Sequence, residues 1–497
     1  MLRAKADRLI AAMARADGTP LALMGGAFAF FAVLYGGYTG KWLERDAVHA
    51  LLAALLIAGV ALRFYRLRPP VIGAAWGLAS LFVAVPLLQL VPLPPWLWTS
   101  LPGHGPVQAV FETSGLDVPW FPVSTVPLAT WLSAAAMGFP LAFFVLGLVL
   151  PPRGTIRFLQ VASLGLASSL LLGALQSLFP ASEGLRVLGQ ELGISSGFFE
   201  NPNHFGFASA LLIMLLPAVL GRLGVDGHSV QAMFMRNALI AIIVTIVVVI
   251  GISSGSRAAI ILSVMALIFL ALEARQQFES RLAGRMFMVL SAGIALLYFS
   301  AELTGTLKDT FFQSEHRPIM WVAGLDLAWA HFPFGTGVGT FELAYLVHEP
   351  VEAMTPFIIN EAHNLYIQIL VEWGFAGAVL MALAAYGLVL GYRQGFGQNA
   401  RDAALKVWTE NTSPKFDSGQ RQLKRVCVAG LVLVMVHGLV DYPERTMALS
   451  GLLAFMLGYV FNVCPLPAAR MVRNVAQKIG TGRSRPAPVR TPHRPRS

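Results

Sequence analysis

Arg257 is the most suggestive candidate for a functional side chain in this sequence. It follows Ser254, Gly255 and Ser256 and lies between two apolar runs, where an unpaired charge is costly. Free backbone N–H groups at a helix start, together with a planar guanidinium, suit an anion such as phosphate. A structural ion pair, or an arginine whose head reaches the membrane surface, explains the same position.

Arg317 is a second candidate for binding an anion. Pro318 suits a helix start, and the apolar residues at 319, 322, 325 and 329 predict an amphipathic helix along the membrane surface. Arg317 would then lie near the lipid headgroups. The alternative is an ordinary exposed arginine beside Glu315.

His363 precedes a long apolar stretch and is flanked by Glu361 and by Asn364, which is a further candidate for sugar or headgroup contact. A histidine in this position can act as a general base or orient an acceptor hydroxyl, and Glu361 is an alternative base. The competing interpretation is a hydrogen-bonding histidine at the membrane surface.

Two more polar groups lie where apolar runs begin or end. Asn201, Asn203 and His204 surround Pro202, which indicates a capped helix start, with sugar or headgroup contact as the functional alternative. A second group lies between the last two apolar runs, where an Asp–Arg structural pair competes with an anion contact by Arg445; it comprises His437, Asp441, Glu444 and Arg445.

Several common catalytic motifs are absent from the sequence. It has no Walker A loop, no HExxH and no paired acidic motif in the segments assigned below to the outer side. Nor does it offer a carboxylate cage for a divalent cation, so we expect neither a metal nor a cofactor. Cys427 and Cys464 both lie in apolar stretches and suggest no disulfide framework.

The composition excludes a soluble globular protein. Of the 497 residues, 56% are hydrophobic and 12% are charged, whereas soluble domains carry about 25% charge. The formal net charge of +10 does not indicate nucleic acid, because the basic residues occupy short segments between apolar runs. We therefore expect an all-α polytopic membrane protein with about 12 transmembrane helices, near residues 21–39, 46–62, 71–91, 127–150, 155–179, 203–221, 237–253, 257–273, 285–301, 365–392, 426–442 and 446–463.

The distribution of basic residues tests this arrangement. Twelve spans place 29 of the 36 Lys and Arg residues on the side of the two termini. The positive-inside rule then predicts that both termini are cytoplasmic. Seven basic residues remain on the outer side: Lys41, Arg45, Arg186, Arg257, Lys308, Arg317 and Arg445.

The expected organisation has three parts. Residues 1–20 form a cytoplasmic N-terminal segment, residues 21–463 form the membrane domain, and residues 464–497 form a basic, disordered cytoplasmic tail. The longest outer loop, 302–364, lies between spans nine and ten, and loops of this length usually carry function.

Five segments together resemble the O-antigen ligase and O-antigen polymerase superfamily of bacterial inner membranes. They occur in the family's order and on the expected side, and the resemblance covers about residues 190–465. The segments are FFENPNHFG (198–206), SGSRAAI (254–260), HRPIMWVAG (316–324), EAHNLYIQILVEWG (361–374) and VDYPERT (440–446).

The resemblance implies a metal-independent, inverting membrane glycosyltransferase with a GT-C-like fold. Its donor would be a glycan on undecaprenyl pyrophosphate, and its acceptor on the periplasmic face would be lipid A–core or another glycan. Carried over by motif, Arg257 and Arg317 would bind the pyrophosphate, Arg445 would be a third contact, and His363 would serve the acceptor.

Several alternative functions stay open at this point. Within the superfamily, ligation to lipid A–core competes with polymerisation of repeat units and with protein O-glycosylation. A transporter or flippase of a lipid-linked or anionic substrate would explain many spans and buried arginines, although the sequence lacks two related halves with broken helices. A non-catalytic assembly partner would leave the outer arginines unexplained.

Overall fold

The computed structural model is built of helices throughout the part of the chain that it describes. The described residues are 18–38, 43–67, 73–188, 190, 192–220, 230–277, 293, 316–351, 354, 358–396 and 418–462. Within them the structure has the α-helices α2 (Thr19–Tyr35), α3 (Leu43–Leu67), α4 (Gly73–Gln89), α5 (Pro95–Trp98), α6 (Gly105–Thr113), α7 (Pro127–Ala136), α8 (Gly138–Val149), α9 (Pro152–Leu178), α10 (Pro202–Leu220), α11 (Val230–Ile252), α12 (Arg257–Gln277), α15 (His316–Ala330), α16 (Phe341–His348), α17 (Leu365–Phe396), α19 (Ser418–His437) and α20 (Met447–Phe461).

Every predicted span except 285–301, nearly all of which lies outside the described residues, overlaps one of these helices. Four helical segments among the described residues are long and apolar enough to cross a membrane: Glu44–Phe64, Pro127–Val149, Pro152–Leu178 and Leu365–Phe396. Shorter apolar helices accompany them, so the described part of the chain is helical and consistent with a membrane protein. The number of spans stays a prediction.

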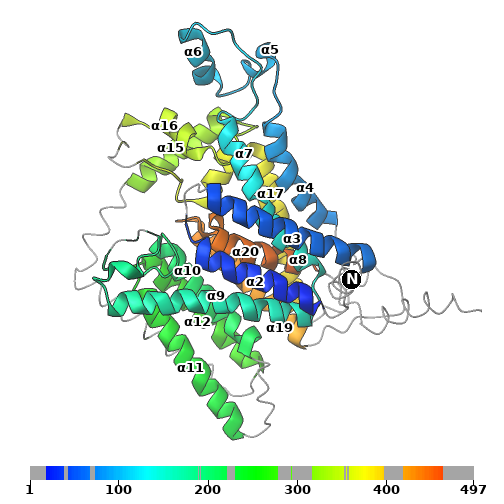
Figure 1. The fold of residues 1–497 in the computed structure, drawn as a ribbon, viewed down its shortest axis with the longest axis vertical. Coiled ribbons are helices and arrows are strands. Elements are labelled where there is room, and N and C mark those ends of the chain that lie inside the picture. The colour runs from blue at the N-terminus through cyan, green and yellow to red at the C-terminus, as the bar shows by residue number, and fades with distance from the viewer. Residues whose placement is uncertain are drawn as a thin grey trace, which may run out of the picture.

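Small residues allow the central helices to pack closely. In Figure 1, α2, α3, α9 and α20 run side by side across the middle of the molecule. A Cβ on Gly147 of α8 would lie 2.2 Å from the carbonyl oxygen of Phe455, and one on Gly458 of α20 would lie 2.0 Å from that of Phe144. The two backbones therefore touch at reciprocal glycines, as is common where membrane helices associate.

Four of the shorter helices lie toward one end of the molecule (Figure 1). α5 and α6 project from the top of the view in Figure 1, and α15 and α16 lie near them. The predicted apolar stripe of α15 is exposed at Ile319, Val322, Leu325 and Trp329, while its opposite side packs in a small core with α16 and α17. That α15 lies along a membrane surface stays a prediction.

α17 is broken at Gly374, which has φ 56° and ψ −137°. The loop 331–340 inserts at the break: the N–H of Thr336 donates to the carbonyl of Val371 at 2.8 Å, and the N–H of Phe375 donates to that of Pro333 at 2.8 Å. The side chain of Gln89 donates to the carbonyl of Glu372 at 2.9 Å. Backbone groups freed by the break therefore find partners inside the protein, as a membrane environment requires.

Candidate active site

One turn between α19 and α20 brings the predicted site residues together. We call residues 437–446 the outer turn; it contains the short 3-10 helix η4 (Pro443–Arg445). The guanidinium of Arg317 donates to the carbonyl of Val440 at 3.1 Å, and the side-chain amide of Asn364 donates to that of Leu439 at 3.1 Å. Arg317 is 123 positions from Val440 in the sequence, and Asn364 is 75 positions from Leu439. The outer turn thus brings Arg317 and the start of α17 together.

Asp441 is the centre of the first polar network on this turn. Its Oδ2 accepts a hydrogen bond from the amide of Asn203 at 2.7 Å, and its Oδ1 accepts one from the N–H of Tyr442 at 3.0 Å. The Nε2 of His204 lies 3.6 Å from Oδ1, and the Nδ1 of His363 lies 3.5 Å from it. We call Asn203, His204, His363, Asp441 and Tyr442 the Asp441 network.

This network holds Asp441 as a buried carboxylate. The side chain is 1% exposed, and burial by itself would raise its pKa. The ring nitrogens of His204 and His363 outweigh that effect and hold the pKa of Asp441 well below its ordinary value. The carboxylate can therefore orient an imidazole and stabilise its protonated form.

His363 is the reachable member of the network. Its side chain is 29% exposed, whereas that of His204 is completely buried. Its φ is 45°, and it is the one non-glycine residue with positive φ among the described residues. The backbone on both sides is fixed, because Trp321 donates to the carbonyl of Ala362 at 3.0 Å and the N–H of Leu365 donates to that of Gly438 at 2.8 Å. Strained backbone of this kind gathers at functional sites.

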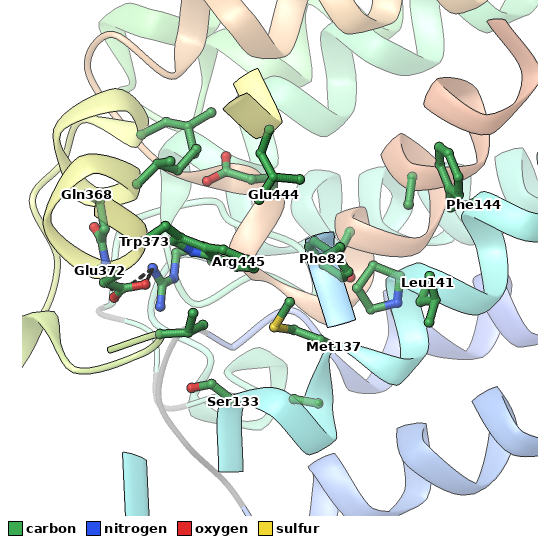
Figure 2. A pocket seen from close by; sticks show the side chains of 18 of the residues that line it. Phe82, Ser133, Met137, Leu141, Phe144, Gln368, Glu372, Trp373, Glu444 and Arg445 are labelled. Atoms are coloured by element: carbon green, nitrogen blue, oxygen red, sulfur yellow. Dashed lines mark hydrogen bonds and ion pairs between the residues drawn. The ribbon is translucent and has the colours of Figure 1, made fainter. Parts of the chain in front are cut away.

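A second polar network surrounds Arg445. Its Nε lies 3.4 Å from Glu361, and its Nη1 donates to both oxygens of Glu372, at 3.2 and 3.1 Å. Gln368 donates to Glu361 and, at 3.2 Å, to Glu372. Figure 2 shows Gln368 and Glu372 reaching from α17 toward Arg445. We call Glu361, Gln368, Glu372, Glu444 and Arg445 the Arg445 network.

Two acids of the Arg445 network, Glu361 and Glu444, are harder to ionise than Asp441. Burial raises the pKa of Glu361 to about 6, although Arg445 opposes the rise. Burial raises the pKa of Glu444 to about 8, and neither of its buried oxygens accepts a hydrogen bond from another described residue. A neutral carboxyl and a charged one therefore lie on the same turn.

A cavity of about 440 Å³ opens beside the Arg445 network. Glu361, Gln368, Glu372, Glu444 and Arg445 line one end of it, and apolar side chains line the rest. Figure 2 shows Phe82, Leu141 and Phe144 along this wall. His363, Asp441, Arg257 and Arg317 are not among the lining residues.

The remaining predicted residues take the following places. Asn201 caps α10, since its Oδ1 accepts the N–H of Asn203 at 2.8 Å, in agreement with the expected capped start. Arg257 is the first residue of α12, also as expected, and the Ser256 hydroxyl accepts the N–H of Ala259 at 3.1 Å. A Cβ on Gly206 would lie 2.3 Å from the Cβ of Ala259, so Arg257 lies at the same end of the bundle as Asn203 and His204.

Sequence reasoning mispaired one residue and missed two. The Asp–Arg pair considered for the outer turn does not form: Arg445 pairs with Glu361 and Glu372, and Asp441 lies against histidines. Glu372 and Gln368 were not singled out, yet they hold Arg445 and Glu361. The signal was present, because a glutamate inside an apolar span is costly without a partner. Their spacing of four residues also places both on one face of a helix.

The fold and the site describe a helical protein suited to a membrane, with a histidine–carboxylate pair on the turn to which Arg317 also binds. Residues 235–382 match the family model described as O-Antigen ligase, and this supports the O-antigen ligase and polymerase superfamily. Proteins of this family are glycosyltransferase-like enzymes that act on lipid-linked glycans and acceptors. Comparison with curated proteins and with solved structures gave no match. The matched segment contains Arg257, Arg317, Glu361 and His363.

Proposed function

We propose that this protein transfers a glycan from undecaprenyl pyrophosphate to lipid A–core on the periplasmic face of the bacterial inner membrane. The observation that carries the proposal is the meeting of Arg317 and His363 on the outer turn, since both lie inside the matched family segment. The uneven distribution of basic residues supports cytoplasmic termini and a periplasmic site. Residues 21–463 would form the catalytic membrane domain.

The proposed reaction is a metal-independent displacement with inversion. The acceptor oxygen bonds to the anomeric carbon while the bond from that carbon to the pyrophosphate oxygen breaks, and the acceptor proton passes to His363. Arg257 and Arg317 stabilise the charge that develops on the leaving pyrophosphate. Attack from the side opposite the leaving group inverts the centre.

Asp441 and the polar groups near it support this role of His363. The carboxylate lies beside Nδ1, which leaves Nε2 for the acceptor, and the charged carboxylate favours the imidazolium that forms. Asn203 and His204 then act through Asp441, because both lie against it and His204 is fully buried. Asn364 fixes the outer turn through Leu439, and Asn201 caps α10.

The geometry favours His363 over Glu361 as the base. Glu361 is 8% exposed and is bound by Gln368 and Arg445. The same pairing occupies Arg445, whose guanidinium already meets two carboxylates. We therefore assign Arg445 to holding Glu361 and Glu372 rather than to binding the pyrophosphate.

The test is genetic complementation with chemical analysis of the products. The gene is deleted in its host and replaced by wild type, Arg257→Ala, Arg317→Ala or His363→Ala, each checked for membrane expression. Arg186→Ala is the matched control, because Arg186 is an outer arginine that binds the carbonyl of Pro180 at 2.9 Å, away from the outer turn. Lipid-linked intermediates and surface polysaccharide are resolved by gel and mass spectrometry.

Full-length glycan accumulating on undecaprenyl pyrophosphate, with bare lipid A–core, supports ligation. Accumulation of single repeat units identifies a polymerase instead. Rescue by all three site variants would overturn the catalytic assignment and favour a transporter of a lipid-linked or anionic substrate.

A further inference from the structure

The cavity beside the Arg445 network is apolar along its walls and polar at one end. α4, α7, α8, α17 and α20 supply the walls, which include Phe82, Leu132, Leu141, Met381 and Leu457. Figure 2 shows Glu372, Glu444 and Arg445 at the polar end. A volume of about 440 Å³ is typical of small-molecule sites. The cavity therefore suits a ligand with one apolar chain and one polar head.

Hydrogen-bond acceptors outnumber donors at the polar end. Arg445 and Gln368 supply the N–H groups, and Glu361 and Glu372 accept them. Both oxygens of Glu444 are buried, and neither accepts a hydrogen bond from another described residue. A buried polar group without a partner is costly, so a ligand that donates to Glu444 would remove an existing cost.

Charge indicates which donor fits. Arg445 is the one basic residue among the described residues that line the cavity, and four acids line it as well: Asp46, Glu361, Glu372 and Glu444. The guanidinium is already paired with Glu361 and Glu372. An anionic head would therefore meet excess negative charge, whereas a cationic head would relieve it.

We propose that this cavity binds an amphiphile with an alkyl chain and a protonated amine head, whose ammonium donates to Glu444. The carboxyl of Glu444 is neutral in the empty cavity, and the ammonium favours its ionised form because opposite charges in contact stabilise each other. The chain lies along the apolar walls, and the head completes the Arg445 network. The inference goes beyond the proposed glycan transfer, because none of His363, Arg257 and Arg317 lines the cavity. Binding of the amphiphile is measured without a glycan donor. A failure to bind would therefore leave the proposed glycan transfer standing, and a failure of glycan transfer would leave the binding proposal standing.

The experiment measures amphiphile binding to the purified full-length protein in nanodiscs. The discs contain phosphatidylcholine, whose head has no N–H donor, and calorimetry follows titrations of dodecylamine, dodecyl phosphate and butylamine at pH 7. We expect dodecylamine to bind at least tenfold more tightly than either dodecyl phosphate or butylamine. Equal or tighter binding of dodecyl phosphate would overturn the proposal, and this comparison needs no variant.

Glu444→Gln tests the proposed contact directly. Loss of one charge-assisted hydrogen bond should weaken dodecylamine binding by about tenfold or more. Glu112→Gln is the matched control, since Glu112 lies on α6, is exposed and does not line the cavity. Unchanged affinity of Glu444→Gln would refute the assignment.

The amine can come from a free amphiphile or from a lipid headgroup. Repeating the titration in discs that also contain phosphatidylethanolamine distinguishes the two sources. A weaker apparent affinity for dodecylamine would show that the headgroup competes for the cavity, and an unchanged affinity would identify the free amphiphile as the ligand.

Discussion

Asp441 of the Asp441 network and Glu444 of the Arg445 network lie three residues apart on one turn, yet their pKa values are shifted in opposite directions. Asp441 accepts hydrogen bonds from Asn203 and Tyr442 and has a ring nitrogen of His204 and of His363 within 3.6 Å, and its pKa lies well below the ordinary value. Glu444 accepts no hydrogen bond from another described residue, and burial raises its pKa to about 8 although Arg445 opposes the rise. Both groups are buried, so the supply of donors, rather than burial, decides which of them is charged.

This difference separates a site suited to proton transfer from a site suited to ligand binding. The charged Asp441 can stabilise a protonated His363, which is partly exposed. The neutral Glu444 lines a cavity that His363 does not reach. The predictions below test whether the two networks are as independent as their contacts indicate.

Removing the imidazole of His363 should have the largest effect. We expect His363→Asn to lower glycan transfer by about 10²- to 10⁴-fold, the usual contribution of a general base, while expression is unchanged. Asparagine tolerates positive φ, so this variant keeps the backbone at φ 45° and isolates the loss of the base. Transfer is measured as glycan passed to lipid A–core by membranes. Activity within threefold of wild type would remove His363 from the mechanism.

Arg445→Met should affect stability more than any other change in the second network. It leaves Glu361 and Glu372 without their cation, and breaking a buried pair costs about 3–5 kcal/mol. Thermal unfolding of the purified protein in detergent measures the loss. Adding Glu372→Gln should restore part of it, because one stranded charge is removed. A melting temperature equal to wild type would show that the guanidinium is not needed to hold the two acids.

The sequence revealed the helices and the candidate arginines, but not the contacts within either network. The lengths of the apolar runs were enough to place the helices, and outer positive charge pointed to Arg257, Arg317 and Arg445. The pairings were not visible, because Asn203 and Asp441 are 238 positions apart and meet only through the packing of α10 against the outer turn. The cavity likewise depends on six helices at once, α3, α4, α7, α8, α17 and α20. Local patterns indicate where an element begins, but they do not identify its neighbour.

Glu444→Gln should change how stability depends on pH. Burial raises the pKa of Glu444 from 4.5 to about 8, so the neutral carboxyl stabilises the folded state. That contribution is complete below pH 4.5 and is lost as the pH rises through 8. Glutamine does not titrate, so the variant should match wild type at pH 5 and melt at a higher temperature at pH 9. If the melting temperatures of Glu444→Gln and wild type differ by the same amount at pH 5 and pH 9, Glu444 does not titrate in this range.

Asn201→Ala should have the smallest effect and should leave the Asp441 network intact. The side chain caps α10 by accepting the N–H of Asn203, and loss of such a cap costs about 1 kcal/mol. Transfer should stay near the wild-type level when it is corrected for the amount of folded protein. Asn203→Ala provides the comparison, because it removes the 2.7 Å hydrogen bond to Asp441 and should lower transfer as well as stability. If Asn201→Ala instead lowers transfer without loss of stability, Asn201 contacts the substrate. The capping hydrogen bond to Asn203 would then form only when no substrate is bound. Comparing the two variants therefore distinguishes the capping of α10 by Asn201 from the hydrogen bond by which Asn203 holds Asp441.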